Sequence, residues 1–229
     1  MKPLPAIPKP RAILFDWDNT LVDNWGIIAE AMNAALTAFD LPAWTLAETK
    51  ARVRASLRDS FPKMFGDRAK EAGRIFSDHF AARHLTELRA MPGAGDLLRS
   101  LAVSGVYLGI VSNKRGRFLR LEADHLGWTG HFMRLVGAAD AIEDKPSVAP
   151  VDLALEGSGV PRGAHVWFVG DTDIDMVCAL NAGCFPVLLR PEPMAPGEFD
   201  LHQPGLHLPD CAALARQLGQ VGVLRAPIL

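Results

Sequence analysis

The sequence has few cysteines, no long apolar run and almost no net charge. An odd number of cysteines in a chain of 229 residues does not suggest a disulfide framework, and Cys178, Cys184 and Cys211 form no Cys-x-x-Cys pair. We expect these cysteines to be reduced and mostly buried. No apolar run approaches the roughly 18 residues that a membrane-spanning helix needs. A formal net charge of −2 provides no basic field for a nucleic-acid polymer, so the expected partner is a small molecule.

The first residues also lack an export signal. Met1–Pro10 contain four prolines and no apolar segment. We expect residues 1–10 to form an extended, Pro-rich arm, and we take the cytoplasm as the expected location. No feature of the sequence marks an interface between subunits, so the oligomeric state stays open.

Apolar strands alternate with amphipathic helices over most of the chain. Because each crossover between parallel strands places a helix on the sheet, this alternation predicts an α/β fold, a Rossmann-like parallel sheet covered on both faces. Ligands of such sheets bind beyond the carboxyl ends of the strands. The predicted strands cover residues 12–15, 106–112, 135–137, 165–169 and 185–189, and the predicted helices of this part cover 95–104, 117–126, 148–156, 174–182 and 209–217.

One long segment interrupts this alternation. Residues 24–89 show apolar residues at helical spacing, as in Trp25, Ile28 and Met32, and no strand signal. Helices are expected to follow Trp25 directly, over residues 45–57, and over residues 67–88, with a break at Phe61-Pro62. We therefore predict a small all-helical domain (24–89) inserted after strand one of an α/β core domain (11–23 and 90–229).

Strand one ends in two carboxylates, Asp16 and Asp18, which a core strand could not bury without partners. Side chains alternate along a strand, so both point the same way while the chain stays extended. Two carboxylates in one small volume repel, so that one is protonated or a cation lies between them. From these residues alone, a strand followed by a capped turn fits equally well.

Two polar segments after later strands fit phosphate binding. Ser112 and Asn113 could offer a hydroxyl and backbone N–H groups to a phosphate, although such a pair also caps helices. Lys145 is followed by Pro146, which biases it towards an extended backbone. A lysine before proline is most often an exposed turn residue, but a held ammonium could neutralise phosphate oxygens and Asp16.

The segment 169–175 is acidic. Asp171, Asp173 and Asp175 follow an apolar strand, and one or two of them could complement the dipole of the next helix. Three of them near Asp16 and Asp18 indicate a divalent cation. Ligands that are all oxygen suit Mg²⁺.

Together these segments resemble the four motifs of the haloacid dehalogenase-like (HAD) phosphatase superfamily. The matching stretches are Asp-x-Asp-x-Thr at 16–20, Val-Ser-Asn-Lys at 111–114, Lys-Pro-x-x-x-Pro at 145–150 and Gly-Asp-x-x-x-Asp at 170–175. The second resembles the phosphoglycolate-phosphatase-like branch, and Ser56–Ser60 is similar to a cap segment of the β-phosphoglucomutase-like branch. The resemblance implies a HAD fold in which residues 24–89 form a C1-type cap that closes over the site.

The resemblance also implies roles for individual residues. Asp16 would be the nucleophile, Asp18 the general acid and base, and Asn19 stands where many relatives have glycine. Arg58 lies in a basic stretch of the cap that would bind a second anion of the substrate. The implied catalytic residues are Asp16, Asp18 and Lys145, the substrate-binding residues are Asn19, Ser112, Asn113, Lys145 and Arg58, and the Mg²⁺ ligands are Asp16, Asp18 through its main-chain carbonyl, Asp171 and, in support, Asp175.

These roles predict a Mg²⁺-dependent phosphatase that hydrolyses a small phosphate monoester through an aspartyl-phosphate. Family members with other chemistries lack an acid at the position of Asp18, which favours a phosphate monoester. A phosphomutase of the β-phosphoglucomutase type is the alternative, and a non-catalytic binding module is a third interpretation. The substrate stays open among phosphoglycolate, sugar phosphates and nucleoside monophosphates.

Overall fold

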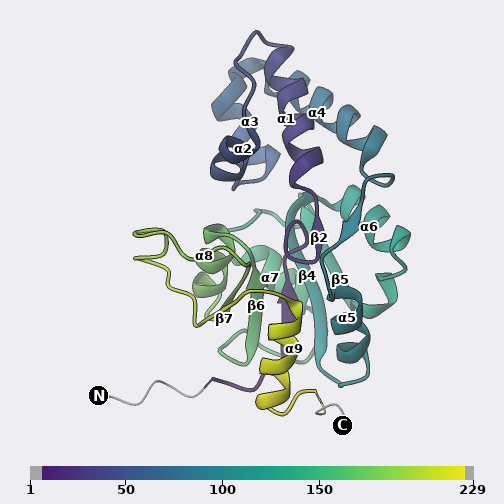
Figure 1. Ribbon diagram of the computed structural model, residues 1–229, viewed down its shortest axis with the longest axis vertical. Coiled ribbons are helices and arrows are strands. Elements are labelled where there is room, and N and C mark those ends of the chain that lie inside the picture. The colour runs from purple at the N-terminus through teal and green to yellow at the C-terminus, as the bar shows by residue number, and fades with distance from the viewer. Residues whose placement is uncertain (1–6, 225–229) are drawn as a thin grey trace.

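Strand β1 (Ala12–Phe15) lies in the middle of a six-stranded parallel sheet in the computed structural model, which describes residues 7–224 (Figure 1). All four of its residues are fully buried, because strands pair with it on both edges and side chains pack against it on both faces. The strand order is β5-β4-β1-β6-β7-β8. The other strands are β4 (Tyr107–Arg115), β5 (Arg134–Ala138), β6 (Val166–Gly170), β7 (Phe185–Leu189) and β8 (Leu206–Leu208).

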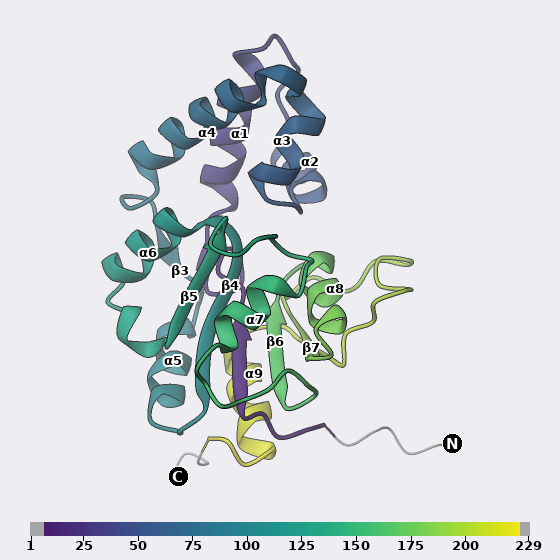
Figure 2. The same ribbon diagram turned by 180° about the vertical axis from the view of Figure 1, so that it is seen from behind.

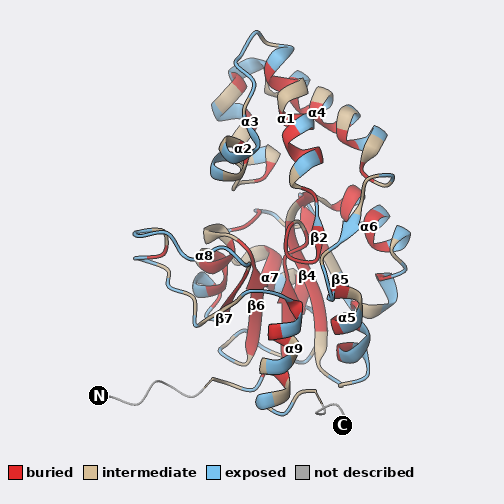
Figure 3. Cartoon of the chain, viewed as in Figure 1, coloured by how far each residue is buried: buried red, intermediate tan, exposed pale blue. Residues whose placement is uncertain are grey.

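Helices cover both faces of this sheet (Figures 1 and 2). Ile13 and Phe15 face one core cluster, whereas Ala12 and Leu14 face the other, as expected from alternation along a strand. The first cluster is closed by α5 (Ala94–Ala102), α6 (Gly116–His125) and α9 (Cys211–Gln220), and the second by α7 (Ala149–Leu155) and α8 (Asp173–Asn181). Figure 3 shows the buried strands between these layers. The predicted α/β class and parallel sheet are confirmed.

A helical region stands above the carboxyl ends of the strands (Figure 1). Its aromatic residues Phe61, Phe65, Phe76 and Phe80 form a core cluster separate from those of the sheet. An antiparallel pair, β2 (Val22–Asp23) with β3 (Arg89–Ala90), joins the region to the sheet. The helices are α1 (Trp25–Thr37), α2 (Leu46–Arg52), α3 (Leu57–Phe65) and α4 (Ala69–Arg83), with a 3-10 turn, η1 (Gly66–Arg68), before α4; a second, η2 (Thr129–His131), precedes β5.

Several element boundaries differ from the sequence prediction. The break expected at Phe61-Pro62 is wrong, because Pro62 lies inside α3 and the burial of Phe61 and Phe65 outweighs the lost backbone hydrogen bond. Strand β4 continues through Asn113 to Arg115, beyond its predicted end at residue 112, and α6 then begins at Gly116, next to the predicted start at residue 117. The short strands β2, β3 and β8 were not predicted, since two or three residues carry no periodic signal.

The chain ends and the cysteines also have a place in this fold. Residues 1–6 of the predicted arm lie outside the described residues, whereas Pro10 is buried and Trp167 Nε1 donates to the Pro8 carbonyl at 2.9 Å. The cysteines are free and buried, as expected. Within residues 7–224, no helix is both long and apolar enough to cross a membrane.

We expect Leu14→Ala to lower the free energy of unfolding by about 2–5 kcal/mol, because a fully buried side chain in the central strand would leave a cavity. Urea unfolding followed by circular dichroism measures the change. Leu201→Ala is the matched control, because Leu201 is 87% exposed, and it is expected to leave the midpoint unchanged. Equal effects of the two substitutions would contradict the assignment of β1 to the core.

Candidate active site

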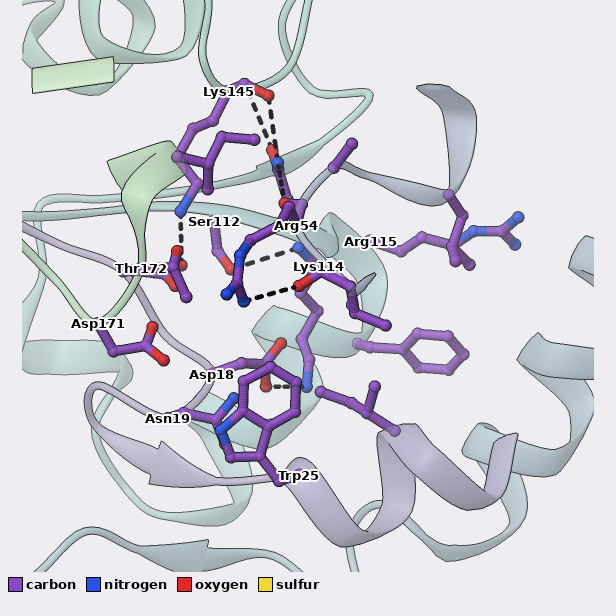
Figure 4. Close-up of a pocket in the computed structure, with 18 of the residues that line it drawn as sticks. Asp18, Asn19, Trp25, Arg54, Ser112, Lys114, Arg115, Lys145, Asp171 and Thr172 are labelled. Carbon is purple, nitrogen blue, oxygen red and sulfur yellow. Dashed lines mark hydrogen bonds and ion pairs between the residues drawn. The ribbon is translucent and has the colours of Figure 1, made fainter. Parts of the chain in front are cut away.

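The predicted site residues converge at the carboxyl edge of the sheet, below the helical region. Asp16 follows β1, Ser112 lies near the end of β4, and Asp171 follows β6 directly. Since these three strands are neighbours and parallel, their ends meet in one place. A single pocket is lined by Asp16, Asp18, Asn19, Ser112, Asn113, Lys145 and Asp171, together with Trp25 and Arg54 from the helical region (Figure 4).

Lys145 joins two of the carboxylates. Its Nζ lies 2.9 Å from Asp16 Oδ1 and 2.6 Å from Asp175 Oδ1, and its side chain is only 2% exposed. The Asp175 carboxylate also accepts hydrogen bonds from the backbone N–H and hydroxyl of Thr172. Gly170 permits this arrangement, because a Cβ there would lie 2.3 Å from Asp175 Cγ. Burial disfavours the ammonium, but Asp16 and Asp175 outweigh it and raise the pKa of Lys145.

The carboxylates of Asp16, Asp171 and Asp175 crowd together, with one oxygen of each lying within 4.8 Å of the others. Burial raises the pKa of Asp16 from 3.8 to about 6. The charge of Lys145 opposes this rise, and the charge of Asp175 adds to it. Burial and then the charges of Asp175 and Asp16 also raise the pKa of Asp171 well above its ordinary value. One ammonium is therefore insufficient to balance these buried carboxylates.

This cluster fits a divalent cation. Asp16 Oδ1 is buried and, among residues 7–224, accepts no well-directed hydrogen bond apart from its ion-pair contact with Lys145. A cation bound between Asp16 and Asp171 would supply the missing partner and favour the ionised forms. Oxygen ligands of this kind suit Mg²⁺. The side chain of Asp18 does not belong to the cluster, which is compatible with the predicted use of its main-chain carbonyl.

Asp18 has a different lysine as its partner. Lys114 Nζ lies 2.8 Å from Asp18 Oδ1 (Figure 4). It also lies 2.8 Å from each carboxylate oxygen of Glu122. No role was predicted for Lys114 from the sequence, although it is the last residue of the Val-Ser-Asn-Lys motif at 111–114. Burial disfavours its ammonium, but Asp18 and Glu122 raise the pKa of Lys114 above its usual value. Burial opposes ionisation of Glu122, but the charge of Lys114 favours it, and the pKa of Glu122 is lowered.

Trp17, between the two aspartates, lies outside the pocket. Its fully buried ring packs edge-on against Trp128 and Phe132, and its Nε1 donates to Glu122 at 2.7 Å. Asn19 does line the pocket and has a φ of 61°, the left-handed conformation that asparagine tolerates best after glycine. The turn after Asp18 therefore survives without glycine.

Ser112 and Asn113 both line the pocket but have different partners. Ser112 is buried in the pocket wall and its Oγ accepts from the Lys114 backbone N–H at 3.3 Å. The Asn113 side chain binds the backbone of Lys145 on both sides, accepting at 3.0 Å and donating at 3.2 Å. Asn113 also donates to the Arg54 carbonyl at 3.4 Å. Asn113 thus fixes the loop that carries Lys145 and touches the helical region.

Arg58 lies outside this pocket. Its guanidinium pairs with the buried Asp144 at 2.8 Å and lines a neighbouring groove between α3 and α6. Arg54, on the loop between α2 and α3, lines the pocket instead and pairs with Asp173 at 2.9 Å. The basic stretch of the helical region therefore does reach the site, but through a different arginine from the one predicted.

The chain matches one family model, haloacid dehalogenase-like hydrolase, over residues 13–188. The chain belongs to this family. It is 31% identical to phosphoglycolate phosphatase from Photorhabdus laumondii, over 76% of this chain and 77% of that one. The phosphoglycolate phosphatase of Aquifex aeolicus is also 31% identical, over 76% and 81%. A HAD-superfamily hydrolase from Ehrlichia chaffeensis has a similar structure, with a TM-score of 0.66, 26% identity, and coverage of 94% and 99%.

Membership confirms the expected family and enzyme class, a HAD phosphohydrolase similar to phosphoglycolate phosphatases. The roles of individual residues stay predictions. Their convergence on one pocket places the four motif segments where such a hydrolase would use them. Family membership thus indicates the type of reaction, and the geometry indicates the pocket in which it would take place.

We expect the stability of the metal-free protein to depend on pH through Asp16. Its folded-state pKa of about 6 exceeds the ordinary 3.8, so between these values the folded state binds more protons than the unfolded state. The contribution to stability is complete below about pH 4 and is lost as the pH rises through about 6. Asp16→Asn removes this loss, so its advantage in free energy of unfolding over wild type should grow from pH 4 to pH 7.

Urea unfolding with a chelator present measures this difference, and Asp152→Asn is the control, because Asp152 is an exposed aspartate of α7. Adding Mg²⁺ should raise the stability of wild type more than that of Asp16→Asn. If the difference in free energy of unfolding between Asp16→Asn and wild type does not change with pH, the folded state does not raise the pKa of Asp16.

Proposed function

We propose that the protein is a Mg²⁺-dependent phosphatase whose substrate is a small phosphate monoester with a second anionic group. The observation that carries this proposal is the pocket itself, in which Asp16, Asp18 and Lys145 share one cavity with the acidic cluster. Phosphorus approached by Asp16 would have Lys145 and Ser112 beside its oxygens. The helical region closes the side from which the rest of the substrate would enter.

In the first step, an Asp16 oxygen attacks phosphorus and the bond to the leaving oxygen breaks, which gives an aspartyl-phosphate. Asp18 donates a proton to the leaving oxygen, and in the second step it accepts one from the water that hydrolyses the intermediate. Lys145 neutralises the transferring oxygens, with Ser112 and Asn113 as further donors. Mg²⁺, held by Asp16, Asp171 and the Asp18 carbonyl with Asp175 in support, would supply charge neutralisation between nucleophile and phosphate.

Arg54 supports a substrate with a second anion. It is the arginine of the helical region that lines the pocket together with Asp18, and its partner Asp173 is partly exposed rather than buried. An exposed ion pair contributes little, so a substrate carboxylate could displace Asp173 at small cost. The relatives named phosphoglycolate phosphatase act, by that name, on a molecule that carries both a phosphate and a carboxylate. Phosphoglycolate is therefore the first substrate to test.

The phosphomutase alternative is not favoured, since the relatives above are phosphatases by name. A mutase would keep water away from the aspartyl-phosphate until a sugar phosphate accepts the group. Sugar-phosphate isomerisation in the presence of a bisphosphate primer would reveal such a reaction. The cytoplasmic location stays a prediction.

We expect wild type to release phosphate from phosphoglycolate in Mg²⁺ and to stop on chelation. Asp16→Asn should lower kcat by more than about a thousandfold, because a neutral amide cannot replace the attacking carboxylate. Phosphate release over a panel of metabolites measures both effects, with Asp152→Asn as control and mass spectrometry to exclude deamidation of the introduced asparagine. Turnover by Asp16→Asn at even a few per cent of wild type would rule out Asp16 as the nucleophile.

Arg54→Met should raise KM for phosphoglycolate by about tenfold, which corresponds to one lost charge-assisted hydrogen bond. KM for p-nitrophenyl phosphate, whose leaving group has no carboxylate, should change much less. The matched control is Arg74→Met, which removes an exposed arginine of α4. If Arg58→Met shows this selectivity and Arg54→Met does not, the role predicted from the sequence for Arg58 is right and the proposal for Arg54 is wrong.

A further inference from the structure

The pocket contains a buried lysine, Lys114, that the mechanism above does not use. Its side chain is 4% exposed, and its ammonium lies between Asp18, at 2.8 Å, and Glu122, whose side chain is fully buried. A buried ammonium needs a carboxylate partner, and Glu122 with both oxygens at 2.8 Å already satisfies that need. The contact with Asp18 is therefore additional to what burial of Lys114 requires.

The same arrangement occurs around the nucleophile. Lys145 joins Asp16 to Asp175, another fully buried carboxylate, just as Lys114 joins Asp18 to Glu122. In both cases the buried carboxylate fixes the ammonium, and the ammonium in turn contacts a carboxylate that faces the pocket. Each of the two reacting carboxylates thus has its own lysine with its own buried support.

Glu122 is held from several directions besides Lys114. Trp17 Nε1 donates to it at 2.7 Å, Asn24 Nδ2 donates at 3.2 Å, and His84 Nδ1 lies at 2.9 Å. Asn24 lies between β2 and α1, and His84 follows α4, so both connections between the sheet and the helical region meet at this carboxylate. The support of Lys114 is consequently built from the core and from both ends of the insert.

These contacts fix one oxygen of Asp18. Lys114 Nζ at 2.8 Å and Asn24 Nδ2 at 2.7 Å both bind Oδ1. Within the described residues 7–224, every hydrogen bond and ion pair of the Asp18 side chain involves Oδ1, which leaves Oδ2 for the substrate. A general acid must lie within about 2.6–3.2 Å of the atom that it protonates, and rotation of the side chain would break that geometry.

We propose that Lys114, held in place by Glu122, is a positioning residue that orients Asp18 for proton transfer to the leaving oxygen. The proposal rests on the proposed function, in which Asp18 is the general acid. Lys114 does not touch the reacting atoms and acts only through Asp18. The importance of Asp18 as an acid depends on the leaving group, because p-nitrophenolate departs with little protonation whereas an alkoxide requires it.

The test compares kcat/KM for phosphoglycolate and for p-nitrophenyl phosphate, because kcat/KM covers the steps up to departure of the leaving group. Lys114→Met keeps most of the stem and removes the ammonium. We expect the ratio of the two values, alkyl over aryl, to fall by about tenfold or more. Glu122→Gln should lower the same ratio, since the lysine then loses its support. Lys63→Met, an exposed lysine of α3, is the matched control and should leave the ratio unchanged.

Should Lys114→Met fail to fold, the double variant Lys114→Met/Glu122→Gln removes both buried charges and takes its place. Equal losses for both substrates, or none, would overturn the proposal, because a merely structural lysine does not discriminate between leaving groups. Crystal structures of wild type and variant give a readout that does not need activity: Asp18 should leave its wild-type rotamer. If wild type hydrolyses neither compound, the proposed function has failed, and an unmoved Asp18 would then still overturn the positioning role.

Discussion

The structure depends on the ion pairs of Lys145, the buried ammonium that holds the end of β1 to the start of α8. Asp16 and Asp175 come from segments far apart in the chain, and neither could be buried so deeply without this partner. The pairing is possible only because β1 and β6 are neighbours in the sheet and because Gly170 leaves room for the Asp175 carboxylate. The ion pairs of Lys145 therefore depend on both the strand pairing and the space beside Gly170.

The balance of charge at this edge is incomplete for a protein without a bound cation. Asp16, Asp171 and Asp175 crowd around one ammonium, and burial raises the pKa of Asp16 and Asp171. A site built only for stability would replace such carboxylates by apolar residues of similar size. Retaining them costs stability, but under the proposed function they would supply a nucleophile and ligands for a divalent cation, which is the usual compromise at catalytic sites.

The helical region contributes to the site from two directions. Trp25 and Arg54 line the pocket from above, while Asn24 and His84 bind Glu122 where the region joins the sheet. The pocket-facing side of the region is accordingly polar in part. The junction is buried and satisfied by hydrogen bonds, so that the region and the sheet share one set of contacts.

The sequence by itself determined the fold class, the helical insert and the four polar segments. Alternation of apolar strands and helices is a local pattern, and Asp16, Asp18, Lys145 and Asp171 belong to short motifs that can be read without knowing any contact. It did not determine that α3 continues through Pro62, where burial of aromatic neighbours overrides a local propensity. Only the tertiary structure decided that Arg54 rather than Arg58 lines the pocket, and that Lys114 and Glu122 support Asp18. These outcomes depend on which face of a helix or strand meets another element, and sequence spacing leaves that choice open. Contacts between residues about a hundred positions apart, such as Trp17 and Glu122, carry no local signal in the sequence.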